Sequence, residues 1–139
     1  MRGERTASAS YEVVSHENME LPRLNDARYN AAEYRYMYAS GTRDGQPYAF
    51  QNQVVKVDIA RGDACIWYAE DCYPGEPVFV PTPDARAEDD GVVLSVVLDA
   101  SKGASFLLVL DAHTFKEVGR AEVPHHIPFG FHGQYFAGV

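Results

Sequence analysis

The sequence predicts an all-β chain, and three observations lead to that prediction. From residue 34 onward, apolar and aromatic residues fall in short runs rich in valine, phenylalanine and tyrosine, which favours strands over helices. Glycine, proline and aspartate separate these runs, as they do in turns. Hydrophobic residues make up 46% of the 139 residues and aromatic residues 12%, a composition typical of a folded, strand-rich chain rather than a disordered one.

The expected strands follow a polar leader. Residues 1–18 lack apolar periodicity and are expected to be flexible, so the folded part is expected to span residues 19–139. Residues 60–63 have the composition of a hairpin turn, and residues 73–75 are expected to break the chain again. The expected β-type segments are residues 34–38, 55–59, 64–68, 76–80, 92–98, 106–110 and 117–123.

Two of these segments mark an internal repeat. Asp58 ends a Val-Lys-Val segment and Asp111 ends a Leu-Val-Leu segment, and each is followed by a polar turn and another strand. The offset of roughly fifty residues is typical of propeller blades. From the residues alone, a small β-sandwich or barrel fits these signals equally well. The near-continuous apolar run around Val96 predicts an inner strand packed on both faces.

The net charge of −8 argues against nucleic acid as a partner, because an acidic surface repels phosphate backbones and anionic lipid head groups. No apolar run reaches the roughly 18–20 residues that span a bilayer, and no signal peptide is evident. These features predict a cytoplasmic chain with at most a peripheral contact with membranes.

The two cysteines carry no recognisable chemistry. Cys65 falls on an expected strand and Cys72 in the loop after it, and neither has the spacing of a metal ligand. We expect both to be free, buried and inert. A disulfide between them stays open as an alternative and would need an oxidising compartment.

The segment 124–133 places His132 between an aromatic residue and a glycine, close to Pro128. Proline fixes φ and glycine allows a tight bend, so this backbone can turn one imidazole inward as a metal ligand. The alternative is a histidine in an ordinary Gly/Pro turn. His125 and His126 are adjacent and point to opposite sides of an extended segment, so at most one of them faces the same cavity.

Five segments, taken in order and spacing, resemble the carotenoid cleavage oxygenase family, and the resemblance covers nearly everything after about residue 18. They are residues 19–25 (Met-Glu-Leu-Pro-Arg-Leu-Asn), 34–38 (Tyr-Arg-Tyr-Met-Tyr), 76–81 (Glu-Pro-Val-Phe-Val-Pro), 88–97 and 124–133. The resemblance implies that residues 19–139 are the C-terminal blades of a seven-bladed β-propeller whose complete form holds Fe²⁺ by four histidines.

The resemblance also implies roles for single residues. His132 matches the last of the four iron ligands, Glu76 the glutamate that orients it, and Glu20 a glutamate that supports a ligand outside this chain. A carboxylate between glycine and proline is costly to bury without a partner, which favours a paired Glu76. The alternatives are an exposed strand-end residue at Glu76 and a loop acid at Glu20.

Phe129 and Phe131 flank the candidate ligand and are expected either to line a substrate tunnel or to pack in the core. The remaining charged candidates are assigned no chemistry. Residues 88–90 (Glu-Asp-Asp) are expected to form a solvated loop, and His16 and His113 are expected to be solvent-exposed.

The implied activity is oxidative cleavage of one double bond of a carotenoid or apocarotenoid by dioxygen, with apocarotenal or retinal-type aldehydes as products. One imidazole does not hold iron by itself, so this chain alone is expected to be inactive and to need the N-terminal portion of such an enzyme, either separately encoded or part of a longer form of the same protein. The alternatives are a catalytically inactive fragment and a non-enzymatic, β-rich binding module.

Overall fold

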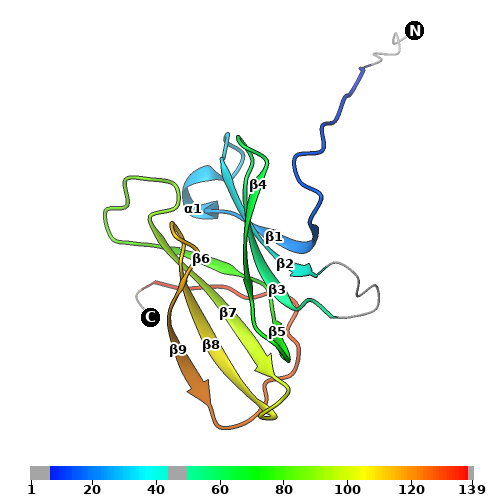
Figure 1. Ribbon diagram of the computed structural model, residues 1–139. Coiled ribbons are helices and arrows are strands. Elements are labelled where there is room, and N and C mark those ends of the chain that lie inside the picture. The colour runs from blue at the N-terminus through cyan, green and yellow to red at the C-terminus, as the bar shows by residue number, and fades with distance from the viewer. Residues whose placement is uncertain (1–6, 44–49, 138–139) are drawn as a thin grey trace, which may run out of the picture.

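The computed structural model describes residues 7–43 and 50–137 and contains two antiparallel sheets (Figure 1). The first sheet has the order β1-β2-β3-β4, and in the second β5 and β6 both pair with β7, which is followed by β8 and β9. The strands are β1 (Asn18–Arg23), β2 (Tyr36–Thr42), β3 (Gln53–Asp58), β4 (Asp63–Tyr68), β5 (Cys72–Pro74), β6 (Val78–Pro81), β7 (Gly91–Asp99), β8 (Ala104–Asp111) and β9 (Glu117–Val123).

The first sheet is a meander of consecutive strands, and the second has the same arrangement once β5 and β6, which pair with β7 one after the other, are counted as one interrupted strand; this is the arrangement of a propeller blade. Asp58 ends β3 and Asp111 ends β8, and both strands are third in their sheets. The all-β prediction and the repeat are therefore confirmed. The sequence did not predict β1 or the single helical turn α1 (Asp26–Tyr29) that follows it.

The strand that pairs with β7 on the side away from β8 is interrupted between β5 and β6. The site described below lies at this interruption. The sequence predicted a strand from Glu76, but β6 begins at Val78. The strand pairing with β7 ends at Pro74 and resumes at Val78; the Gly75 N–H still donates to the carbonyl oxygen of Val96 at 2.9 Å, whereas Pro77 has no N–H to donate. Glu76 is thereby placed in a short loop between β5 and β6.

The core lies between the two sheets and is mainly aromatic and aliphatic. Tyr38 of β2 stacks on Phe79 of β6 at 5.6 Å and on Phe115 at 6.4 Å between ring centroids. Burial alternates along β7, so that Val93 and Val97 are fully buried while Val96 is 41% exposed. The prediction that β7 packs on both faces is wrong, because only one of its faces meets the first sheet.

The cysteines are free, as predicted, but only Cys72 is buried. Burial raises the pKa of the Cys72 thiol, which keeps it protonated and unreactive. Cys65 lies on β4 at the edge of the first sheet and is exposed, so its predicted burial is wrong. An edge strand has a neighbour on one side only, which the sequence pattern does not show.

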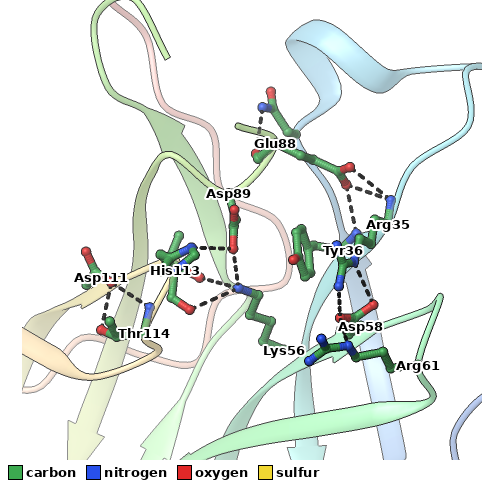
Figure 2. A network of polar contacts seen from close by, with 12 residues as sticks. Arg35, Tyr36, Lys56, Asp58, Arg61, Glu88, Asp89, Asp111, His113 and Thr114 are labelled. Carbon is green, nitrogen blue, oxygen red and sulfur yellow. Dashed lines mark hydrogen bonds and ion pairs between the residues drawn. The ribbon is translucent and has the colours of Figure 1, made fainter. Parts of the chain in front are cut away.

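The acidic run 88–90 is a structural clasp and not the predicted solvated loop (Figure 2). Asp89 is buried and its Oδ2 lies 2.7 Å from Nζ of the buried Lys56 on β3. The ammonium also donates to the carbonyl oxygens of Ala112 and His113, at 2.6 and 3.3 Å. The three N–H donors of Lys56 on β3 are thus matched by one acceptor in the loop before β7 and two in the turn after β8.

The neighbours of Asp89 complete this clasp. The carboxylate of Glu88 accepts hydrogen bonds from the backbone N–H groups of Arg35 and Tyr36. His113 is exposed, as predicted, yet its Nδ1 lies 3.2 Å from Oδ2 of Asp89. The acidic run therefore joins the two sheets.

Acid is expected to weaken the fold. The pKa of Asp58 is lowered by its hydrogen bonds with Arg35, that of Asp111 by the backbone N–H and hydroxyl of Thr114, and that of Glu117 by Arg120. A lowered pKa in the folded state contributes stability that is present above the unfolded value, 3.8 for Asp or 4.5 for Glu, and is lost as pH falls through the folded one.

The melting temperature is therefore expected to be steady near neutral pH and to fall steeply below about pH 4.5. Thermal unfolding across pH 3–7 measures this, with Asp58→Asn as the matched variant. Asp58→Asn is expected to be less stable at neutral pH and to lose less on acidification. Equal losses in the two proteins would show that the Arg35 contact contributes nothing.

Candidate metal centre

The segment that follows β9 runs back past the second sheet (Figure 1, red), and its residues 127–135, which include His132, lie against the exposed face of that sheet. The carbonyl oxygen of His125 accepts from the N–H of Ser105 at 3.0 Å, and the hydroxyl of Ser105 accepts from the N–H of Ile127 at 2.9 Å. These two bonds fasten the start of the segment to β8. Its far end is held at Glu76.

Glu76 and His132 form the centre of the site. The Glu76 side chain is 4% exposed, its Oε1 lies 3.0 Å from Nδ1 of His132, and its Oε2 accepts from the N–H of Gly133 at 2.7 Å. An ionised carboxylate only accepts hydrogen bonds, so in a neutral ring facing it Nδ1 would carry the proton and Nε2 would keep its lone pair. A metal-bound histidine is held in this way.

The outer part of the His132 ring is open. The side chain is 65% exposed, and Phe131 meets its ring edge-on with centroids 4.5 Å apart. This exposure would leave a metal ion bound at Nε2 accessible to further ligands from outside this chain. Within residues 7–43 and 50–137, no group of three His, Cys, Asp or Glu side chains is placed to hold a metal ion.

The residues present therefore fit one ligand position of a metal site and no more. The donor is an imidazole, which suits iron. The buried acid on its second nitrogen supplies the orientation and basicity that such a ligand needs.

An apolar groove of about 270 Å³ adjoins His132. Leu94, Val96 and Leu107 on the open face of the second sheet line it, together with Phe129 and Phe131. The two phenylalanines are 50% and 71% exposed, so they do not pack in the core. Phe129 stacks on Phe50 at 4.6 Å between centroids, which braces one end of the groove.

Glu20 is not part of this cluster. It lies exposed on β1, opposite Ser40 of β2, and in the described part of the chain no hydrogen bond joins it to Glu76 or His132. Its place in the first sheet is comparable with that of Glu76 in the second, because Glu20 lies on the first strand of its sheet and Glu76 lies in the loop between β5 and β6. His125 and His126 are also exposed, and neither joins the His132–Glu76 pair.

Arg23 is the site residue that the sequence did not reveal. Its Nη1 lies 3.5 Å from Oε2 of Glu76 and donates to the carbonyl oxygen of Gly133, and its Nη2 donates to Oε1 of Gln134. Only its place in the family-like run at 19–25 drew attention to it. Nothing in the sequence relates it to residues more than a hundred positions later.

The chain matches the family described as retinal pigment epithelial membrane protein over residues 2–137. It belongs to this family. The resemblance to carotenoid cleavage oxygenases, read from five short segments, is thereby confirmed, and with it the assignment of the two sheets to propeller blades.

Relatives in the family carry dioxygenase names. The mitochondrial carotenoid-cleaving dioxygenase of Mustela putorius furo is 41% identical over 133 residues, which are 91% of this chain and 24% of that protein. The β,β-carotene 15,15'-dioxygenase of Gallus gallus is 42% identical over 120 residues, which are 86% of this chain and 22% of that protein.

Solved structures agree with these matches. The cobalt-substituted Synechocystis apocarotenoid oxygenase superimposes with a TM-score of 0.82 at 30% identity, over 88% of this chain and 26% of that one. The chain thus spans about a quarter of the length of the family members that it matches. In its described part, no helix has the length and apolar character needed to cross a membrane.

Proposed function

We propose that this chain is the C-terminal part of a non-haem Fe²⁺ carotenoid cleavage dioxygenase, and that His132 supplies one of four histidine ligands. The observation that carries the proposal is the contact of buried Glu76 with Nδ1 of His132 at 3.0 Å, which leaves Nε2 free for the metal. Family membership supports it, because the relatives named above are dioxygenases acting on carotenoids.

The other three ligands belong to protein outside this chain, such as a separately encoded N-terminal portion that completes a seven-bladed propeller. The open ring of His132 and the open face of β7 support this arrangement. Glu20 is proposed to orient a ligand of that other portion. Its exposure on β1 leaves its carboxylate available to such a partner.

Iron held there supplies the activation of dioxygen, and the overall reaction converts one carbon–carbon double bond and one dioxygen molecule into two carbonyl groups. This chain's residues bind and orient. Glu76 fixes the tautomer and direction of the His132 ring, and the groove beside Phe129 and Phe131 offers apolar surface to a carotenoid or apocarotenoid. Apocarotenal or retinal-type aldehydes are the proposed products.

One observation favours a different function. The described residues provide a single imidazole to the site, which also fits an inactive fragment or a non-enzymatic β-rich binding module. For location, we propose cytoplasm with at most peripheral membrane contact. The relative from Mustela putorius furo is named mitochondrial. Fractionation of cells that express the protein decides between these two locations.

A chimera tests the proposal. In this chimera, residues 7–137 replace the matched 24% of the Mustela putorius furo dioxygenase. The purified, iron-loaded protein is incubated with β-carotene and oxygen. Aldehyde products, measured by chromatography, are expected with the wild-type segment and not with His132→Ala. Full iron loading without any aldehyde product would contradict the dioxygenase proposal and favour the binding module.

A further inference from the structure

We propose that Arg23 is a positioning residue that locks the Glu76 carboxylate and the Gly133 backbone, and through them fixes the direction of the His132 ring. The role of this arrangement in iron binding rests on the proposed function. The positioning itself follows from contacts within this chain.

Arg23, Glu76 and Gly133 form a closed ring of contacts. The N–H of Gly133 donates to Oε2 of Glu76 at 2.7 Å, and the carbonyl oxygen of Gly133 accepts from Nη1 of Arg23 at 3.4 Å. Nη1 of Arg23 lies in turn 3.5 Å from the same Oε2. Both polar groups of Gly133 are therefore held by an ion pair whose two members are also bound to each other.

Arg23 also compensates the charge of the buried Glu76 carboxylate. The Glu76 side chain is 4% exposed, and an ionised carboxylate is costly to bury without compensation. Among the described residues its charged partners are Arg23 and, only if protonated, His132. Arginine stays charged under all ordinary conditions. Arg23 therefore supplies a permanent positive charge beside the buried Glu76 carboxylate.

An irregularity in β1 sets the direction in which the Arg23 side chain points. Glu20 faces Ser40 on β2 but Arg23 faces Tyr38, so β1 contains one extra residue at this point. Leu21 has a φ of 55°, a backbone region that is uncommon outside glycine. Such bulges re-aim side chains and are frequent beside functional sites.

A second contact steadies Arg23 from the other side. Oδ2 of Asp26, at the start of α1, lies 3.5 Å from Nε of Arg23. The guanidinium is 19% exposed and lies between Asp26 and Glu76. Because β1 belongs to the first sheet and Glu76 lies in the loop between β5 and β6 of the second, Arg23 also ties the two sheets together at the site.

Nitrogen-15 NMR of this chain, without metal or substrate, tests the proposal. The readouts are hydrogen exchange at the Gly133 amide and the ring-nitrogen shifts of His132, which report its tautomer. In Arg23→Met, exchange at Gly133 is expected to rise at least about tenfold, and the ring shifts to move from a single Nδ1–H form toward an average of both tautomers.

The matched control is Arg28→Met. Arg28 lies in α1, is exposed, and donates to the carbonyl of Ala85 rather than to any residue of the site. The same loss of charge there is expected to leave both readouts unchanged. Arg23→Lys keeps the charge but not the forked geometry, and is expected to give intermediate values.

Wild-type exchange and ring shifts in a folded Arg23→Met protein would overturn the proposal. If that variant does not fold, Arg23→Gln decides, because glutamine is uncharged and shorter than arginine and so loses both the pair with Glu76 and the reach to Gly133; unchanged readouts there would equally overturn it. No readout involves iron or catalysis. Failure of the chimera would therefore refute the dioxygenase proposal and leave the assignment of Arg23 standing.

Discussion

Replacing His132 with alanine is expected to abolish iron retention and carotenoid cleavage in the chimera. In the proposed function the imidazole is the ligand that the described residues contribute, and its Nδ1 lies 3.0 Å from Oε1 of Glu76. Loss of a residue that merely supports a ligand typically weakens metal binding by about 10- to 100-fold, so loss of the ligand itself should exceed that range. Iron content after dialysis against a chelator measures the effect.

Two further variants make this result specific. Glu76→Gln keeps the shape of the side chain but removes the charge, and is expected to weaken iron binding by about 10- to 100-fold. His126→Ala removes an exposed histidine from the same segment and is expected to retain iron and activity. If His132→Ala bound iron as tightly as His126→Ala, His132 would not be a ligand.

Replacing Lys56 with methionine is expected to destabilise this chain by about 3–5 kcal/mol, because it leaves Asp89 buried without its ammonium partner. The Lys56 and Asp89 side chains are 6% and 4% exposed. Methionine preserves most of the aliphatic stem, so the loss reports mainly the charge and its hydrogen bonds. Chemical denaturation followed by tryptophan fluorescence measures the free energy of unfolding, and Trp67 is partly screened by the core.

Lys102→Met is the matched control for that experiment. Lys102 pairs with Asp99 at 3.1 Å, but its side chain is 57% exposed, and exposed pairs contribute about 0–1 kcal/mol. The two variants remove the same group from two ion pairs that differ in burial. Equal losses of stability would show that the buried clasp does not hold the sheets together.

Local patterns in the sequence predicted most of the strands. Period-two alternation and turn residues located seven of the nine strands found in residues 7–43 and 50–137, and the equivalence of Asp58 and Asp111 identified the repeat. The missed elements depend on longer-range effects. β1 is irregular, with an extra residue and a positive φ at Leu21, and β5 is a three-residue strand whose pairing with β7 becomes visible only in the fold.

The candidate site was predicted in part, and for a similar reason. Glu76 and His132 were identified by their place in family-like segments, and the structure brings them into contact. Arg23 and Asp89 were not assigned roles, because a charged side chain in a sequence does not show which distant group it will meet. Asp89 becomes buried only when β3 supplies Lys56, and Arg23 becomes a site residue only when the last segment folds back to Gly133.

The most direct test of the central claim is to locate the iron relative to His132. Anomalous diffraction at the iron absorption edge, from crystals of the iron-loaded chimera, shows the metal and its ligands together. We expect one iron bonded to Nε2 of His132, with Nδ1 of the same ring still hydrogen-bonded to Glu76. An iron ion held by other side chains, with the His132 ring turned away from it, would contradict the account.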